Sequence, residues 1–120
     1  IQAAVPVVAP LTHDGMGNIL NTNADTMAAT VAKALTEEFD VTLTYCFEKP
    51  GVMADAEDDD SVIPSINTES YARLKADGIV SGGMIPKLDN AFDSISSGVK
   101  RVVITHFMDI QASMGTVIEK

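Results

Sequence analysis

Two short runs of residues carry groups that could bind a polyphosphate and transfer one phosphoryl group. Residues 21–25 (NTNAD) supply two amides and a carboxylate where an extended segment turns into a helical pattern. Residues 81–87 (SGGMIPK) supply a flexible glycine loop and then a lysine in the first turn of an expected helix. Backbone amides and the positive end of a helix favour phosphate at such a place. Together the two runs predict part of a phosphoryl-transfer site.

Each run also has an ordinary structural explanation. A carboxylate such as Asp25 in the first turn of a helix complements the helix dipole, which contributes about 0.3–1 kcal/mol. The glycine pair could form a simple turn, and Lys87 could be a solvated charge. Asn21 and Asn23 favour the functional interpretation, because three short polar groups are more than one helix cap requires. The sequence has no P-loop of the form Gly-x4-Gly-Lys-Ser/Thr, so the predicted phosphate site is of another kind.

The acidic run, the two histidines and the cysteine form no recognisable metal site in the sequence. The acidic run 55–60 fails as an EF-hand loop, because its sixth position is not glycine and its twelfth is not glutamate. We expect a solvated loop there, and no metal site. His13 and His106 have no second histidine or cysteine at ligand spacing, which favours structural or surface roles. Cys46 is the single cysteine of the sequence, so an internal disulfide is excluded. Because it lies within an apolar run, we expect it to be an inert core residue.

Composition and charge argue against several classes of protein. Hydrophobic residues make up 46% and charged residues 21% of the 120 residues, as in an ordinary globular domain. The net charge of −9 argues against nucleic acid and anionic membranes as partners. The longest apolar stretches, 3–11 and 102–104, are far shorter than the ~20 residues that span a bilayer. With no secretory signal pattern, we expect a cytoplasmic location.

Hydrophobic periodicity predicts strands that alternate with helices. The apolar segment 5–11 contains two prolines and is typical of an edge strand. Turn signals predict a hairpin loop over 13–18, and residues 48–64 are irregular and acidic. The other strands are expected at 19–20, 41–47, 102–105 and 115–118.

Three segments have helical character. The first covers 24–35. A second begins after a cap at Asn67 or Thr68 and ends near Gly78, and a third begins with Pro86 at its first position and ends at Gly98. The residues expected on their inner faces are Ala24, Met27, Ala28, Val31 and Leu35; Tyr71, Ala72 and Leu74; and Leu88, Ala91, Phe92 and Ile95.

This alternation predicts a single α/β domain with a largely parallel sheet between helices. Ligands of such sheets bind at the carboxyl ends of strands. Residues 21–25 and the segment after Phe47 both follow expected strands, so we expect them to share one site.

The two runs, in this order and spacing, resemble the carboxyl-terminal half of the amino acid kinase family, and in particular its members that phosphorylate N-acylglutamates. The similarity extends from 5–11 (VPVVAPL) through 79–88 (IVSGGMIPKL) to 115–118 (GTVI), which is nearly the whole chain. It implies a carbamate kinase-like fold. It also implies that ATP, with Mg²⁺ held mainly by its phosphates, phosphorylates the γ-carboxylate of an N-acyl-L-glutamate in arginine biosynthesis. N-acetyl-L-glutamate is the favoured acceptor.

The resemblance implies roles for individual residues. Asn21 matches a family asparagine that contacts the acylated amino acid, and Asn23 is a second substrate-binding candidate. Asp25 matches an aspartate that orients catalytic lysines, and Lys87 matches the lysine that stabilises the transferred phosphate. The nucleotide-binding residues expected from the resemblance are Thr44, Glu48, Gly51, Gly82, Gly83 and Met84.

Two features depart from the family pattern. The family usually carries Thr-Asp-Val-x-Gly after the strand, whereas residues 44–51 (TYCFEKPG) are longer and lack that aspartate, so Glu48 is its candidate replacement. The family's amino-terminal half supplies a glycine-rich phosphate loop, a second catalytic lysine and most of the acyl-glutamate pocket. We therefore expect residues 1–120 to be the nucleotide-binding domain of a larger homo-oligomeric enzyme, assembled mainly through that other half. The domain alone is expected to be inactive.

Other interpretations stay open on the sequence alone. Another kinase of the same family could use a different carboxylate, carbamate or phosphate as acceptor. The domain could instead be a non-catalytic nucleotide-binding or regulatory module, or a folded piece without a function of its own. Acetyl and larger acyl groups are not distinguished by these 120 residues.

Overall fold

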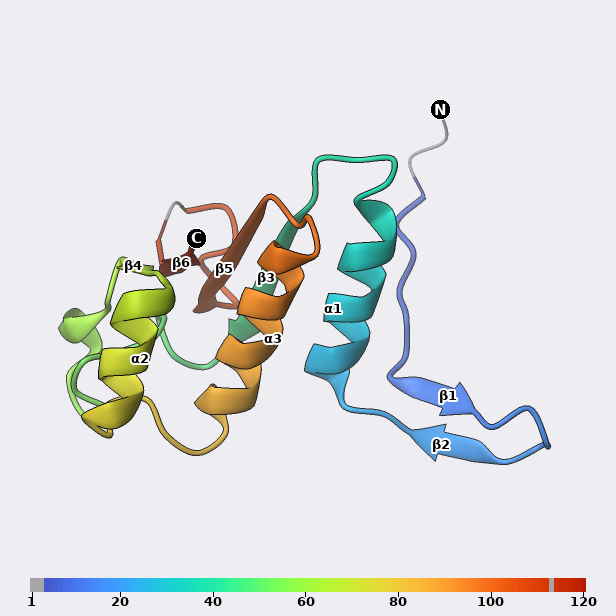
Figure 1. Cartoon of the computed structure of the whole chain (residues 1–120), viewed down its shortest axis with the longest axis horizontal. Coiled ribbons are helices and arrows are strands. Elements are labelled where there is room, and N and C mark those ends of the chain that lie inside the picture. The colour runs from blue at the N-terminus through green and yellow to red at the C-terminus, as the bar shows by residue number, and fades with distance from the viewer. Residues whose placement is uncertain (1–3, 113) are drawn as a thin grey trace.

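Two helices packed on two parallel strands form the centre of the molecule (Figure 1). The structure is a computed structural model that describes residues 4–112 and 114–120. Along the chain the elements are β1 (Leu11–His13), β2 (Ile19–Asn21), α1 (Ala24–Leu35), β3 (Thr42–Phe47), the 3-10 helix η1 (Asp59–Ser61), β4 (Ser65–Ile66), α2 (Thr68–Ala76), α3 (Met84–Ser96), β5 (Arg101–His106) and β6 (Thr116–Ile118).

The main sheet has four strands in the order β3-β5-β6-β4. β3 pairs with β5 and β4 with β6 in parallel, whereas β5 and β6 are antiparallel. Alternation along the strands sends Leu43, Tyr45, Val102 and Ile104 to one side, where all four are buried. α1 contacts β3, α3 contacts β5, and the two helices pack against each other (Figure 1). The predicted α/β class is confirmed, although the antiparallel β5–β6 pair was not predicted.

α1 and α3 both begin at the end of the sheet where β3 and β5 finish (Figure 1). Each helix leads into the strand that it covers, so helix and strand run in opposite directions. The amino ends of two helices and the carboxyl ends of two parallel strands therefore share one edge. Helix amino ends carry partial positive charge, and ligands of open α/β sheets bind at this edge.

Most predicted elements are present. α1 covers the predicted residues 24–35, and β3, β5 and β6 lie within one residue of their predicted bounds. Asn67 caps α2 through a capping box with Ser70, as its position suggested. Gly98, with φ of 107°, follows the last turn of α3. β1 and β2 form the predicted hairpin. The two-residue strand β4 was not predicted.

The predicted strand over 5–11 is wrong except for Leu11, the first residue of β1. Residues 4–10 form neither helix nor strand, and Val5 and Val7 are exposed. Pro6 and Pro10 have no N–H group to donate to a neighbouring strand. The β-branched composition of this segment therefore did not lead to strand pairing.

The predicted start of α3 at Pro86 is also wrong, because the helix begins at Met84 and Pro86 is its third residue. Proline is tolerated there, since the N–H groups of the first turn have no partner inside the helix. Two burial predictions need correction as well. Ala72 is exposed on α2, and Cys46 is exposed because alternation places it on the face opposite Tyr45.

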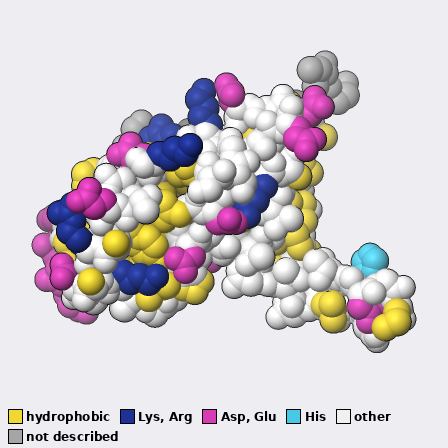
Figure 2. All heavy atoms as spheres, viewed as in Figure 1, with side chains coloured by type: hydrophobic (Ala, Val, Ile, Leu, Met, Phe, Trp, Pro, Cys, Tyr) yellow, Lys and Arg dark blue, Asp and Glu magenta, His cyan; other side chains and the backbone are white. Residues whose placement is uncertain are grey.

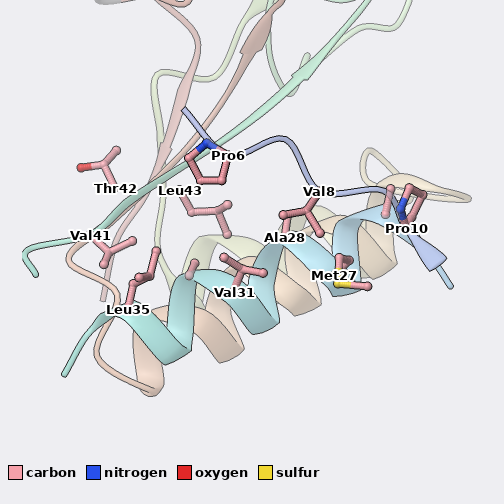
Figure 3. Close-up of a pocket in the computed structure, with 12 residues that line it drawn as sticks. Pro6, Val8, Pro10, Met27, Ala28, Val31, Leu35, Val41, Thr42 and Leu43 are labelled. Carbon is pink, nitrogen blue, oxygen red and sulfur yellow. The ribbon is translucent and has the colours of Figure 1, made fainter. Parts of the chain in front are cut away.

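The predicted inner face of α1 is not its most buried face. α1 buries Ala29 and Ala32, whose small side chains allow close packing. The predicted apolar stripe instead lines a groove of about 350 Å³ between the helix, the start of β3 and residues 6–10 (Figure 3). Val31 and Leu35, both in this stripe, are 39% and 43% exposed. Helical spacing thus located an apolar stripe without revealing what covers it.

Acidic side chains gather at the left edge of the molecule, around η1 (Figure 2). Asp55 and residues 57–60 are all exposed, so the predicted solvated loop is confirmed. Across residues 4–112 and 114–120, no group of three or more His, Cys, Asp and Glu side chains could hold a metal ion. In the same residues, every helix is too short or too polar to cross a membrane.

Candidate active site

Asp25 and Lys87 form an ion pair between the first turns of α1 and α3. The Lys87 Nζ atom lies 2.9 Å from both Oδ1 and Oδ2 of Asp25. The Lys87 side chain is only 15% exposed and that of Asp25 29%. Partial burial strengthens a charge-assisted hydrogen bond relative to one in open solvent. The two residues predicted to carry the chemistry are therefore in direct contact.

Local sequence explains why both side chains lie at this edge. The Asn23 Oδ1 atom accepts a hydrogen bond of 3.0 Å from the Thr26 N–H and caps α1. Asp25 is then the second residue of the helix, where a carboxylate meets the partial positive charge of the amino end. Lys87 is the fourth residue of α3. The turn before α3 needs glycine at Gly82, because φ there is 55°.

Lys87 keeps hydrogen-bonding capacity beyond the ion pair. An ammonium group carries three N–H donors. The two Asp25 oxygens at 2.9 Å accept two of them. One N–H donor is thus left for an anionic oxygen. This arrangement can present a positioned ammonium N–H to a phosphoryl group.

Tyr45 completes the surroundings of the pair, and sequence reasoning assigned it no role. Tyr45 is 4% exposed, and its ring centroid lies 4.8 Å from Lys87 Nζ. The Tyr45 hydroxyl donates a hydrogen bond of 3.2 Å to the backbone oxygen of Asp25. Burial, and then the negative charge of Asp25, raise the pKa of Tyr45 to about 12. Strand alternation places Tyr45 on the helix-facing side, and that was the signal that could have identified it.

The glycine loop leaves the amino end of α3 accessible. Gly83 is the N-cap of α3 and makes no side-chain capping bond. Both Gly82 and Gly83 are exposed, and a Cβ atom built on either would meet nothing within 4 Å among the described residues. The loop can therefore come close to a ligand, as a phosphate-binding loop requires.

A groove of about 190 Å³ lies beside this loop. It joins the segment after β3 to the start of α3, and so brings together two parts of the predicted nucleotide site. Gly51 and Met84 are the predicted nucleotide-binding residues that line it. The full lining is Phe47, Lys49, Gly51, Val52, Met53, Ala56, Ile79, Ser81 and Met84.

Gly51 also has a structural reason to be glycine. A Cβ atom there would lie 2.8 Å from Thr116 Oγ1 and 2.9 Å from Val62 Cγ1. The Thr116 hydroxyl is itself fixed, because it accepts a hydrogen bond from the Val52 N–H and donates one to the Ile63 carbonyl. Close packing therefore accounts for glycine at this position without any ligand.

Three predicted binding residues lie away from this groove. Thr44 points to the opposite face of the sheet, beside Val103 and Thr105. Glu48 is exposed and does not line the groove. Asn21 is exposed at the end of β2, which belongs to a separate two-stranded sheet and not, as expected, to the main sheet (Figure 1). Their binding roles stay predictions that gain no support from the structure. Asn23 has a demonstrated role as a helix cap.

Known proteins resemble this chain over most of its length. Residues 2–106 match the model of the amino acid kinase family. Over 119 residues the chain is 60% identical to the acetylglutamate kinase of Phocaeicola vulgatus, a match that covers 99% of this chain and 46% of that enzyme. The chain therefore spans about half the length of the curated relatives it matches.

Solved structures agree with this similarity. The crystal structure of smu.665 from Streptococcus mutans has a TM-score of 0.75 at 29% identity, covering 94% of this chain and 42% of that one. Carbamate kinase from Giardia lamblia bound to AMP-PNP has a TM-score of 0.65 at 21% identity, covering 88% of this chain and 39% of that one. The second match shows the fold alone, and it confirms the carbamate kinase-like architecture. By fold and by sequence, the chain belongs to the amino acid kinase family.

Proposed function

We propose that this chain is the ATP-binding half of an acylglutamate kinase. The reaction transfers the γ-phosphoryl group of ATP to the γ-carboxylate of N-acetyl-L-glutamate, a step of arginine biosynthesis in the cytoplasm. The observation that carries the proposal is the partly buried Asp25–Lys87 pair at the shared edge of α1 and α3. Sequence identity of 60% to half of an acetylglutamate kinase supports this choice of acceptor.

Phosphoryl transfer needs alignment and neutralisation of charge more than covalent chemistry by the protein. Lys87 offers its remaining N–H and its charge to the oxygens of the transferred group, while Asp25 holds the ammonium in place. A carboxylate acceptor is already ionised at neutral pH, so the site needs no general base. Mg²⁺, held by the phosphates of ATP, supplies further neutralisation when it is bound.

The groove beside the glycine loop suits the nucleotide. Phe47, Met53 and Met84 give it an apolar lining, of the kind that nucleotide bases occupy. Lys49 adds an ammonium group, which forms an exposed ion pair with Asp59 at 3.7 Å. The net charge of −9 repels an anionic nucleotide at long range. Lys49, Lys87 and the amides of the glycine loop are therefore the local groups that we expect to attract it.

The other half of such an enzyme completes the site in our proposal. We expect it to pack against the open flank of α1, where an apolar groove lies beside β3, an edge strand of the main sheet. The same half would supply most of the acylglutamate pocket and the main contacts of a homo-oligomer.

A coupled assay of ADP release tests this function with the full-length protein, Mg-ATP and three acceptors in turn: N-acetyl-L-glutamate, carbamate and L-glutamate. We expect turnover of about 1–100 per second with N-acetyl-L-glutamate and much less with the others. The 120-residue chain alone should show no turnover but weak ATP binding by calorimetry, because it lacks the complementary half. If carbamate were turned over faster, it would replace N-acetyl-L-glutamate as the proposed acceptor. A full-length protein that is inactive with all three acceptors would contradict the proposal.

A further inference from the structure

One aromatic side chain touches both members of the Asp25–Lys87 pair. The Tyr45 ring lies under the Lys87 ammonium at 4.8 Å, and its hydroxyl reaches the backbone oxygen of Asp25 at 3.2 Å. Through these contacts β3 is connected to the first turns of α1 and α3 at the same point. The proposed function assigns work to Lys87 and Asp25 but none to Tyr45.

We infer that Tyr45 is a positioning residue that orients the Lys87 ammonium for phosphoryl transfer. The inference rests on the proposed function, because it describes how Lys87 performs its role there. Tyr45 has no need to touch the substrate. Its effect is to fix the direction in which Lys87 presents its remaining N–H.

The ring matters because a lysine side chain is long and flexible. Lys87 has a four-carbon stem, and the ion pair to Asp25 holds its ammonium from one direction only. An ammonium within about 6 Å of an aromatic centroid is attracted to the ring face, more strongly when both groups are desolvated. Tyr45 is 4% exposed and Lys87 15%, so this contact is largely shielded from water. Carboxylate and ring together restrain the ammonium from two directions.

The hydroxyl has a separate task. Its hydrogen bond ties the middle of β3 to the first turn of α1 and so holds the ring in place. The raised pKa of about 12 keeps the phenol neutral and able to donate over the working range of an enzyme. The ring contact and the hydroxyl contact can therefore be separated by substitution.

Tyr71 provides a matched control. It is also buried, its ring stacks on Phe92 at 5.1 Å, and its hydroxyl donates a hydrogen bond of 2.6 Å to Asp89. The cation over its ring, Lys75, has a side chain that is 46% exposed. Removing Tyr71 therefore disturbs a comparable aromatic contact without touching the Asp25–Lys87 pair.

The test measures kcat, both KM values and the melting temperature for Y45L, Y45F and Y71L in the full-length protein. We expect Y45L to lower kcat about 10-fold while both KM values stay within about 2-fold, because the lost contact orients a group in the transition state. Y45F keeps the ring and should retain kcat within about 3-fold. Y71L should lower the melting temperature as much as Y45L but leave kcat nearly unchanged. If Y45L fails to fold, Y45M replaces it, since methionine fills irregular gaps.

A double variant separates this inference from the proposed function. If Tyr45 acts only through Lys87, Y45L/K87M should have the same residual kcat as K87M. A further loss in the double variant, or a kcat of Y45L equal to that of Y71L, would overturn the positioning role. A normal kcat for K87M would instead contradict the proposed function, whatever Y45L shows.

Discussion

The first turn of α1 and its outer flank have opposite surroundings. At the first turn, the Asp25 side chain pairs with Lys87 from α3, and its backbone oxygen accepts a hydrogen bond from Tyr45 of β3. Along the flank, Val31 and Leu35 are more than a third exposed and line an open apolar groove (Figure 3). One end of the helix thus finds its partners within the described chain, whereas the apolar stripe is only partly covered by residues 6–10.

The difference shows that two kinds of sequence signal carry different information. A carboxylate in a first helical turn is already stabilised by the partial positive charge of the helix end. Whether it also forms an ion pair depends on which residues the tertiary structure places beside it. An apolar stripe at helical spacing states only that something apolar should cover it. Here Asp25 pairs with Lys87 inside the described chain, and the apolar stripe forms the surface where we expect the rest of a longer enzyme to pack.

Breaking the Asp25–Lys87 pair tests the first turn of α1 and should have the largest effect on activity. In the full-length protein, Asp25→Asn should lower kcat by a factor of about 100 or more, because it deletes a preorganised charge at the reacting centre. The matched control is Asp93→Asn, which breaks the Lys33–Asp93 pair between the same two helices at their other ends. That exposed pair contributes at most about 1 kcal/mol, so kcat should hardly change. Equal activity of the two variants would reduce Asp25 to a partner of the helix dipole.

Truncating apolar side chains compares the closed and open sides of the helix pair. Leu88, on α3, is fully buried, so Leu88→Ala should cost about 2–5 kcal/mol of unfolding free energy. Val31→Ala should cost less than about 1 kcal/mol in the 120-residue chain, because Val31 is 39% exposed. Denaturant titration of both variants gives these values.

The same Val31→Ala change sharpens the packing proposal when it is measured in the full-length protein. If the additional half covers the groove, the loss there should exceed the loss in the short chain by about 1 kcal/mol. Equal losses in the two proteins would show that the groove stays open.

Alkaline titration should reveal the tight packing of both tyrosines. Burial raises the pKa of Tyr45 to about 12, and burial together with the Asp89 hydrogen bond raises that of Tyr71. For both tyrosines the pKa in the folded protein exceeds that in the unfolded chain. The neutral phenols therefore stabilise the folded state fully below pH 10.0, and this contribution is lost as the pH rises through the folded pKa. Tyrosinate absorbance should therefore appear late and together with loss of circular dichroism. Y45F should make stability less sensitive to pH in this range, and early titration in an intact fold would contradict the expectation.

Local rules predicted much of this structure. The cap at Asn67, the glycine after α3 and the hairpin turn depend on groups a few residues apart, so spacing alone locates them. The cap at Asn23 follows the same local rule, but this residue was predicted to bind substrate. The resemblance to the amino acid kinase family added expected roles for Asp25 and Lys87, which stay predictions. Burial was harder to predict, because helical or strand periodicity shows which residues share a face but not which face another element covers.

Tertiary structure decided how distant residues meet. Asp25 and Lys87 lie 62 positions apart, and Asp25 and Tyr45 lie 20 apart, so only the packing of α1, α3 and β3 brings them together. The antiparallel placement of β6 and the exposure of Cys46 were settled in the same way. Sequence determined the elements and the charged groups at their ends, because these depend on local backbone and capping energetics. The Asp25–Lys87–Tyr45 contacts and the open flank of α1 followed from the packing of elements against one another, which no local pattern encodes.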